Sequence, residues 1–444
     1  MKKLFIGLVL LTLVLSTGCS AIAPTAEDNQ PTEEGTGAMT PSEPGVQMSS
    51  LQREMAPAVT DAQIQTLARD NTAFALDFYN QLRTAEGNII YSPFSISLAL
   101  AMTMAGAAGS TQAAMQEALR LSQPVDTLYP TYDALLLAIE ASEAASNENE
   151  EGDPFTLNIA NSIWGQAGYP FKEPFLNTLA QYFGAGMYTV DYQQAPEPAR
   201  LAINGWVEDE TNAKIKDLIP EGAIDTLTRL VLANAIYFKG SWYTAFDENA
   251  TVAAPFHLLD GSQMDADLMT LSGEHLMYGQ GDGYQVVQLP YMSTDFVMTL
   301  IVPDQGEFET VESALSAENY AKMTTRLDYK LVDVQMPKFD FDTSVNANNI
   351  LVALGMGEAF DASTADFSGM TDEDKLVISD VIHKATITVD ESGTEAAAAT
   401  AVIMKLTAAL PEDALKLVLD RPFLFFIEHQ PTGSILFMGR VVEP

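Results

Sequence analysis

Cysteine is almost absent from this chain of 444 residues, in which Cys19 is the only one. A single thiol excludes a disulfide within the chain and a zinc centre built from several thiolates. Histidine is also scarce, and no HxxxH or HExxH pair occurs among His257, His275, His383 and His429. We therefore predict that the protein has no metal site and needs no cofactor.

Positive charge is the second shortage. The chain has 22 Lys and Arg residues against 60 Asp and Glu residues, which gives a formal net charge of −38. Nucleic-acid backbones and anionic membrane surfaces are both bound through clusters of Lys and Arg. We therefore predict no nucleic-acid partner and no direct binding to an anionic membrane, and we interpret the acidity as a feature of solubility.

Motifs for catalysis are missing as well. The chain has no GxSxG turn of a serine hydrolase and no phosphate-binding Walker loop. The glycines of GQGDG, residues 279–283, lie between two strand-like runs and predict a turn. The acidic run TDEDK, residues 371–375, lacks the spacing of a calcium loop. Because no motif supports a hydrolase, we predict that the protein is not an enzyme.

The amino terminus has two lysines followed by a short apolar run, MKKLFIGLVLLTLVLSTGCS. The run is too short to span a bilayer and has the layout of a secretory signal. Cys19 follows a glycine, which resembles a bacterial lipoprotein signal and implies that Cys19 is lipidated. We expect a signal peptide over residues 1–18, export, and membrane attachment only through Cys19. Ordinary secretion with cleavage nearby stays open.

Residues 19–60 are rich in Pro, Thr, Glu, Gly and Ser. A segment of this composition buries too little apolar area to offset the entropy that it would lose on ordering. We predict a flexible tether with a root-mean-square reach of about 35 Å. The folded body is then expected over residues 61–444.

The body begins with helical patterns and continues with long strands. Apolar residues recur at helical spacing over 61–86, and Ser92-Pro93 is a typical start of a second helix. Residues 124–154 are acidic and predict loops around a short helix. Strand-like runs are concentrated later, for example over 228–246 and 376–391, without a strict βαβ alternation. This order favours an α+β fold over a doubly wound sheet.

A run of small residues near the carboxyl end has two unlike faces. If the chain from residue 394 onward forms a strand, alternate side chains point to opposite sides. One side is uncharged and grows from small to large, with Thr394, Ala396, Ala398, Thr400, Val402, Met404 and Leu406. The other side carries the charges of Glu395 and Lys405. This pattern is typical of a strand with one buried and one wet face, although an alanine run also suits a helix.

Several long motifs of the body occur in the order of a known family: NIIYSPFSISLALAMTMAGAAGSTQAAM, NGWVEDETNAKI, LVLANAIYFKGSWYTAF, QMPKFDF, VIHKATITVDESGTEAAAAT and DRPFLFFI with GSILFMGRVV. On these segments, residues 61–444 resemble the serpin family. The resemblance implies one α+β domain with three β-sheets, eight or nine helices and an exposed reactive-centre loop. It also implies a monomeric inhibitor that traps a serine protease as a covalent acyl complex, by inserting its cleaved loop into the central sheet.

The resemblance also implies roles for individual residues. The hinge of the loop comprises Glu391, Gly393, Thr394, Glu395, Ala396, Ala397, Ala398 and Ala399. The shutter, a polar cluster under the place where the central sheet opens, comprises Ser92, Ser95, Asn234 and His383. The breach, where insertion begins, comprises Trp242 and an ion pair of Lys338 with Glu391. For that pair, two separately solvated charges are the alternative.

The reactive bond lies, by resemblance, fourteen residues after the hinge glycine, between Thr407 and Ala408. A small residue before the bond suits elastase-like or subtilisin-like proteases. Bonds after Leu406 or Lys405 stay open and would suit chymotrypsin-like or trypsin-like proteases. Residues 124–154 lack a basic stripe, so we expect no activation by heparin. A second function also stays open, a non-inhibitory surface protein that keeps the serpin fold for binding or adhesion.

Overall fold

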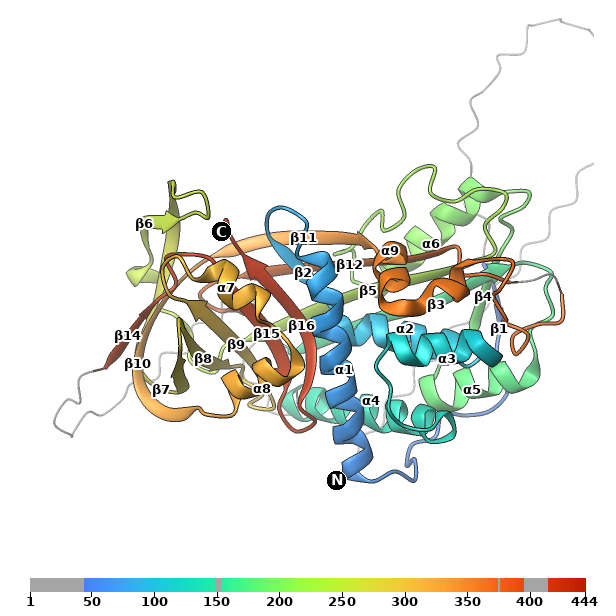
Figure 1. Cartoon of the computed structure of the whole chain (residues 1–444), viewed down its shortest axis with the longest axis horizontal. Helices are drawn as coiled ribbons and strands as arrows, with labels where there is room; N and C mark the ends of the chain where they lie inside the picture. Colours follow the sequence, from blue (N-terminus) through green and yellow to red (C-terminus); the bar gives the residue numbers. More distant parts are fainter. Residues whose placement is uncertain (1–43, 148–153, 374–375, 395–413) are drawn as a thin grey trace, which may run out of the picture. The chain divides into compact units, whose positions relative to one another are not determined.

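The computed structural model describes residues 44–147, 154–373, 376–394 and 414–444 (Figure 1). Its α-helices are α1 (Asp61–Leu82), α2 (Pro93–Met104), α3 (Gly109–Ala118), α4 (Val125–Asn147), α5 (Glu173–Phe183), α6 (Pro196–Glu210), α7 (Phe308–Ser313), α8 (Ala317–Thr324) and α9 (Asn348–Leu351). Its strands are β1 (Gly45–Gln47), β2 (Ile89–Tyr91), β3 (Thr156–Gln166), β4 (Met187–Val190), β5 (Leu230–Ser241), β6 (Val252–His257), β7 (Gln263–Gly281), β8 (Tyr284–Pro290), β9 (Phe296–Pro303), β10 (Asp328–Pro337), β11 (Phe339–Asn346), β12 (Asp380–Val389), β13 (Gly393–Thr394), β14 (Leu415–Val418), β15 (Phe423–His429) and β16 (Ser434–Val441). The α+β prediction is confirmed.

The strands form two hydrogen-bonded networks. The central sheet has the order β1-β4-β3-β5-β13-β12-β11, and the second sheet has the order β14-β10-β7-β8-β9-β15-β16-β2, with β6 paired to β7. We expected three sheets. The second network is continuous because the long strand β7 pairs with β6 along its first part and with β8 along its last part. A left-handed Gly273, with φ +67°, lies between these two parts.

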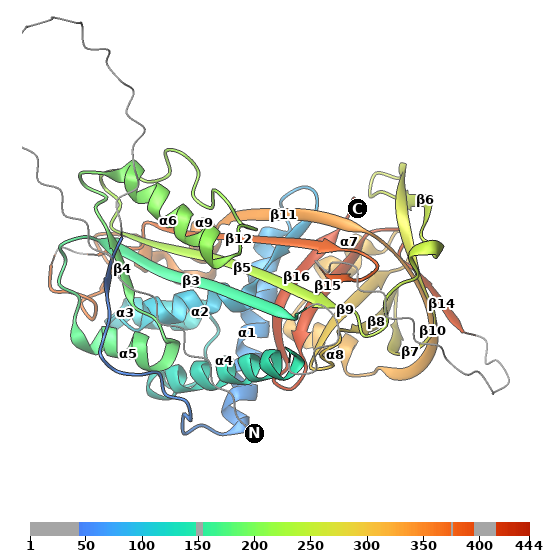
Figure 2. The ribbon, with the colours of Figure 1, turned by 180° about the vertical axis from the view of Figure 1, so that it is seen from behind.

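Helix α2 lies between the central sheet and the second sheet, and every one of its twelve residues is buried. Nine of these residues are apolar, the others being Ser95, Ser97 and Thr103, and this composition is expected for a helix with no solvent-facing side. It starts as predicted, with Ser92 as N-cap and Pro93 in the first turn. Figure 2 shows α2 behind strands β3 and β5, and Figure 1, drawn from the opposite side, shows it in front of them. Its place under the central sheet brings its first residues close to the functional site described below.

A second apolar cluster covers the outer face of the central sheet. Helix α6 packs there, with Ile203 and Val207 buried in the same cluster as Val231 and Ala233 of β5. The two faces of β5 are therefore both covered, which explains its nearly continuous apolar sequence.

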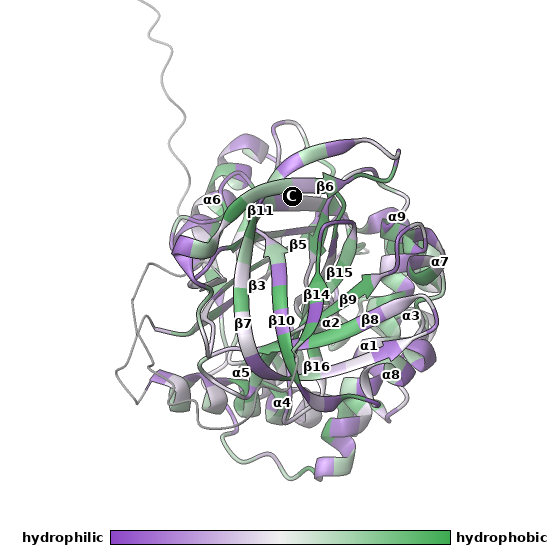
Figure 3. Cartoon of the chain, turned by 90° about the vertical axis from the view of Figure 1, so that its left-hand side faces the viewer, coloured by the Kyte–Doolittle hydropathy of each residue, from purple (hydrophilic) through white to green (hydrophobic). Residues whose placement is uncertain are grey.

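Strands β9 and β15 of the second sheet carry hydrophobic residues along their length, whereas the surrounding helices carry many hydrophilic ones (Figure 3).

The segment before α1 corrects the predicted tether boundary. Residues 45–47 form β1, which pairs antiparallel with β4 and adds a seventh strand to the central sheet. Farther along, Arg53 donates a 2.8 Å hydrogen bond to the buried carboxylate of Asp133. This ordering was missed because it depends on backbone pairing and on the ion pairs of Arg53 with Asp133 and Glu140, which composition does not reveal. Residues 44–60 therefore belong to the body.

Helix α4 corrects a second prediction. We expected loops around a short helix at 124–154, but α4 runs over 23 residues, from Val125 to Asn147. Pro130 lies inside the helix, as its sixth residue, where its missing N–H removes one backbone hydrogen bond. Its buried face includes Leu128, Tyr132, Leu135, Leu136 and Ile139. That apolar spacing outweighs the acidic composition, and the one buried carboxylate of the helix, Asp133, is paired with Arg53.

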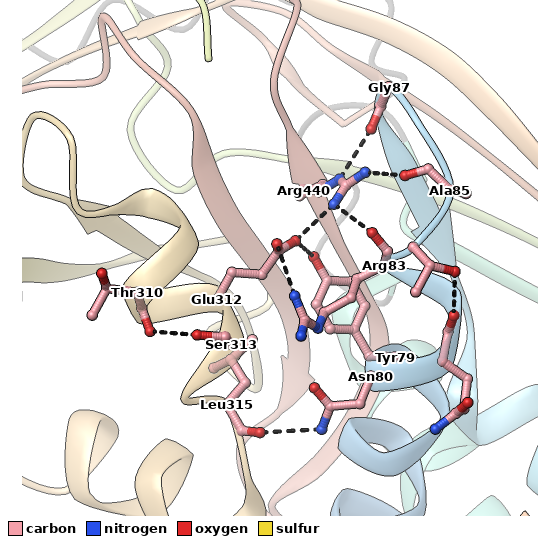
Figure 4. Close-up of polar contacts among 12 residues, drawn as sticks. Tyr79, Asn80, Arg83, Ala85, Gly87, Thr310, Glu312, Ser313, Leu315 and Arg440 are labelled. Atoms are coloured by element: carbon pink, nitrogen blue, oxygen red, sulfur yellow. Dashed lines mark hydrogen bonds and ion pairs between the residues drawn. The ribbon is translucent and has the colours of Figure 1, made fainter. Parts of the chain in front are cut away.

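The most highly charged buried cluster lies away from the central sheet (Figure 4). The guanidinium of Arg440 on β16 lies 2.9 Å from the carboxylate of Glu312 on α7, and both side chains are buried. Glu312 also accepts a 2.6 Å hydrogen bond from Tyr79 of α1, and Arg440 donates to three backbone carbonyls. The cluster joins α1, α7 and β16. Because each of its buried charges has a partner of opposite sign, we interpret it as structural.

Candidate functional site

The site is built where β5 and β12 separate. From Asp380 to Ala385, β12 pairs directly with β5 in parallel, from Val231 to Ile236. Beyond that stretch, β13 lies between the two strands. Thr394 pairs with Gly240 on one side and with Val389 on the other. The same two strands are thus joined at one end and held apart at the other by the first residues of the alanine-rich segment.

The chain enters this gap through a tight turn. The Asp390 carboxylate accepts hydrogen bonds from the backbone N–H groups of Ser392 and Gly393, at 2.8 and 3.1 Å. Gly393 is needed for close approach, since a Cβ at that position would collide with the carbonyl oxygen of Gly240. Gly393 has no left-handed φ, so the close approach is what requires glycine at this position. Thr394 follows and is 1% exposed.

The predicted shutter residues meet at the joined end of the two strands. Asn234 on β5 and His383 on β12 are neighbours in register, and their side chains hydrogen-bond to each other. The backbone N–H of Ser92 donates to His383 Nε2 at 3.0 Å. Asn234 also donates to the hydroxyl of Ser95 at 2.6 Å. All four predicted residues are buried and belong to one network.

The network determines the tautomer of His383. A backbone N–H can only donate, so Nε2 of His383 is an acceptor and Nδ1 carries the proton that is donated to Asn234 Oδ1. Burial lowers the pKa of His383 to about 3, although its hydrogen bond with Asn234 acts in the opposite direction. His383 is therefore neutral at physiological pH, and it holds β5 and β12 together through a neutral hydrogen bond.

The breach residues surround the open end. The backbone N–H of Trp242 donates to Ser392 O at 2.9 Å, and its indole Nε1 donates to Asp390 O at 3.0 Å. The indole ring stacks on Tyr291 at 4.7 Å. Trp242 thereby binds the turn that leads into β13 through both its backbone and its side chain.

Lys338 and Glu391 form the ion pair that the resemblance implied, with Nζ 2.6 Å from Oε2. The Glu391 carboxylate also accepts a 2.6 Å hydrogen bond from Thr251. Burial would raise the pKa of Glu391, but its bonds with Lys338 and Thr251 outweigh burial and the net shift is downward. The side chain of Lys338 is 40% exposed, so the pair lies at the rim of the site.

Sequence reasoning missed two side chains of the site. Asn161 on β3 donates to Ser95 O at 3.0 Å and accepts hydrogen bonds from the side chains of Ser95 and Asn234. No pattern distinguishes Asn161 from Asn158, which lies in the same strand. Tyr291 lies 2.9 Å from the hydroxyl of Thr394. No local pattern distinguishes this tyrosine from the others in the chain.

Several predicted residues lie outside the described part of the chain. They are Cys19, Glu395, the four alanines Ala396, Ala397, Ala398 and Ala399, and the reactive-bond residues Thr407 and Ala408. Their roles stay predictions. Within the described ranges, no group of three or more His, Cys, Asp or Glu residues could hold a metal ion. Among the same residues, no helix has the length and apolar character to cross a membrane.

Comparisons with known proteins agree with this geometry. A family model described as serpin (serine protease inhibitor) matches residues 69–444. An uncharacterized serpin-like protein of Thermococcus kodakarensis is 36% identical over 404 residues, which cover 91% of this chain and 92% of that protein. The human leukocyte elastase inhibitor is 36% identical over 392 residues, which cover 86% of this chain and all of that protein. The native-state crystal structure of tengpin, a thermophilic serpin, matches with a TM-score of 0.79 and 26% identity, over 91% of this chain and all of tengpin.

The chain therefore belongs to the serpin family, and its fold is the serpin fold. Within that fold, the gap between β5 and β12 is the place where the described chain passes from the body into the alanine-rich segment. The family relationship identifies the class of protein as related to protease inhibitors. Residues 44–60, with strand β1, precede the part that the family model matches.

Proposed function

We propose that the protein is a suicide inhibitor of serine proteases and not an enzyme. The observation that carries the proposal is β13, the start of the alanine-rich segment, which already lies between β5 and β12 and pairs with both. A gap that accepts two residues of a strand can be extended by separating the parallel pairs that follow it. In this proposal, the rest of the segment enters the gap after a protease has cut it.

The register of β13 predicts where each inserted residue would lie. We continue the antiparallel pairing of Thr394 along the segment. Each step of two residues toward the carboxyl end is then matched by a step of two residues toward the amino end of β5 and of β12. Ala396 would lie level with Phe238 and Ile387, Ala398 with Ile236 and Ala385, and Thr400 with Asn234 and His383. The residues closest to the open end are thus alanines, which need the least space while the sheet is still separating.

At its predicted level, Thr400 would meet polar side chains of both neighbouring strands. Insertion must break the hydrogen bond between His383 and Asn234, since the new strand would lie between them. Breaking that bond would leave buried polar groups unpaired, which is unfavourable unless they are satisfied again. A threonine hydroxyl at this level can donate and accept. We infer that Thr400 is polar, between the apolar residues Ala398 and Val402 of the same face, for this reason.

Insertion of the strand is the source of free energy. About a dozen new ladder hydrogen bonds at about 1 kcal/mol each give on the order of 10 kcal/mol, before any apolar burial. The uncut protein would hold this free energy in reserve, because the segment is anchored at both ends. Cutting one bond releases the constraint and makes insertion favourable.

The chemistry belongs to the attacking protease. Its serine oxygen bonds to the carbonyl carbon of Thr407, the peptide bond to Ala408 breaks, and the new amine leaves with a proton from the protease's acid. Insertion then carries the acylated protease away before water can hydrolyse the ester. The similarity to leukocyte elastase inhibitors supports an elastase-like target. Bonds after Leu406 or Lys405 would change the target class.

One experiment tests both trapping and the position of the bond. The protein is incubated with elastase, subtilisin, chymotrypsin and trypsin, and covalent complexes are sought on denaturing gels. The mass of the released carboxyl-terminal peptide then identifies its first residue, which we expect to be Ala408. Absence of a complex with all four proteases, together with an unchanged melting temperature after loop cleavage, would favour the non-inhibitory alternative.

We further propose that the protein is exported and attached to a membrane through lipidated Cys19, and acts as a monomer. The layout of residues 1–19 supports this proposal, since the charged, apolar and cysteine-containing parts follow in the required order. Labelled palmitate should be incorporated into the wild-type protein and absent from C19S. Equal labelling of both would contradict the anchor.

A further inference from the structure

A side-chain hydrogen bond joins the second sheet to the hinge. The hydroxyl of Tyr291 lies 2.9 Å from the hydroxyl of Thr394. Both residues are buried, with 0% and 1% exposed. Tyr291 directly follows β8 of the second sheet, whereas Thr394 is the last described residue of β13 in the central sheet. The contact therefore connects the body to the strand that starts to fill the gap.

The ring of Tyr291 is held in place from several sides. It stacks on Trp242, with centroids 4.7 Å apart and 15° between the planes. Phe238 meets it at 5.0 Å and 72°. Its backbone N–H donates to Phe296 O at 3.1 Å. Because the ring cannot turn away, the body fixes the position of its hydroxyl. The hydrogen bond forms only when the hinge places Thr394 beside that hydroxyl.

Thr394 is the first residue of β13 with a side chain to place. Backbone hydrogen bonds repeat along a strand, so they hardly distinguish one register from the next. A slip of one residue turns every side chain to the opposite face of the sheet. The position of Thr394 opposite Gly240 and Val389 therefore decides which face each later residue presents.

We propose that Tyr291 is a positioning residue, which seats Thr394 and so sets the register of loop insertion before a protease attacks. The proposal rests on the inhibitory function proposed above. A slip of one residue would bring the carboxylate of Glu395 to the buried side, where a charge without a partner is unfavourable. A seated hinge also shortens the path to full insertion, and thus favours trapping over release of cleaved inhibitor.

Three variants test the pair. Y291F keeps the ring and removes its hydroxyl, T394V keeps the volume and removes the other hydroxyl, and the double variant removes both. Each single change leaves one buried hydroxyl unpaired, so we expect the seated hinge to be populated about fivefold less. The number of inhibitor molecules consumed per molecule of elastase trapped should rise at least about threefold in each single variant. The double variant should show a smaller effect than the two single effects combined.

The matched control is Y192F, which removes the hydroxyl of a buried tyrosine that bonds to Trp164 O at 3.2 Å, away from the open end and from Thr394. This variant should lose stability to a similar extent and leave the consumption ratio unchanged. A ratio that rises equally in Y192F and Y291F would overturn the proposal, because the effect would then follow general stability. An unchanged ratio in Y291F would overturn it as well.

A second measurement does not depend on inhibition. Hydrogen exchange of residues 390–394 is followed in the intact protein without protease. Y291F and T394V should lose protection by about fivefold or more, whereas Y192F should match the wild type. Equal exchange in Y291F and the wild type overturns the positioning role. If the wild type traps no protease, the proposed function fails, and this exchange measurement still decides whether Tyr291 seats the hinge.

Discussion

The two ends of the boundary between β5 and β12 differ in what holds them. At the joined end, six consecutive residue pairs and the neutral bond of His383 with Asn234 connect the strands directly. At the open end, the described residues that lie between the strands are Gly393 and Thr394, and Thr394 pairs with both strands. The difference shows that the sheet is tightly closed at one end and already divided at the other. Opening is therefore expected to spread from the hinge toward the shutter.

The largest expected effect is at the open end. T394R places a charge on the buried side of β13, where Thr394 is 1% exposed, and should prevent insertion. Cleavage of the wild-type loop should raise the melting temperature by about 20 °C, from on the order of 10 kcal/mol of new hydrogen bonds. T394R should lose this rise and become a substrate, as measured by calorimetry and gel assay. T394S, which keeps the hydroxyl, is the control, and a gel-stable complex with T394R would contradict the insertion mechanism.

The next effect lies where the segment that follows β1 contacts helix α4, and it tests whether the response to cleavage is specific to the gap. R53M leaves the carboxylate of Asp133 buried without its partner, which should lower the free energy of unfolding by about 3 kcal/mol. R53M/D133N should recover much of that loss, as measured by denaturant unfolding. We expect cleavage to raise the melting temperature of R53M as much as that of the wild type. If cleavage did not raise the melting temperature of R53M, the contact of Arg53 with Asp133 would also control insertion.

Acidification should weaken the joined end. Burial lowers the pKa of His383 to about 3, below the value of about 6.5 expected in the unfolded chain. Stability is therefore independent of His383 above pH 6.5 and falls as the pH drops toward 3, by up to about 1.4 kcal/mol per pH unit. Burial lowers the pKa of His429 to about 4 and adds in the same direction.

The variant H383Q isolates the contribution of the shutter. Between pH 7.5 and 5.0 it should lose about 1–2 kcal/mol less unfolding free energy than the wild type, because glutamine does not titrate in this range. H429Q serves as the matched control, since it removes a histidine whose pKa is lowered to a comparable extent and which lies away from the gap. An equal pH dependence in H383Q and the wild type would mean that His383 is not the acid-sensitive group.

The smallest effect is expected at the rim of the open end. K338M removes the cation of a pair in which the Lys338 side chain is 40% exposed. Solvent screening limits the loss to about 1 kcal/mol, and Thr251 still binds the Glu391 carboxylate. Thermal unfolding of K338M and of the conservative K338R should therefore differ only slightly. If K338M lost as much free energy of unfolding as R53M, the ion pair at the rim would be holding the sheet together.

Much of this molecule was accessible from sequence. The helix starting at Ser92-Pro93, the long apolar strand that became β5, and the polar residues Asn234 and His383 were all predicted. Apolar periodicity and long motifs carry such features within short stretches of chain. The length of α4 and the strand β1 were missed, because acidic and polar compositions suggested loops while distant partners ordered both segments.

The amino-acid sequence by itself determined the family, the α+β class and a hinge with one uncharged face, because each depends on residues close together in the chain. Only the tertiary structure decided that two hinge residues are already seated between β5 and β12. It also decided that Asn161 and Tyr291 complete the site, and that Arg53 reaches Asp133. These contacts join residues 66, 103 and 80 positions apart. Pairs so distant in the chain are brought together by the packing of the two sheets and the helices, which no local pattern encodes.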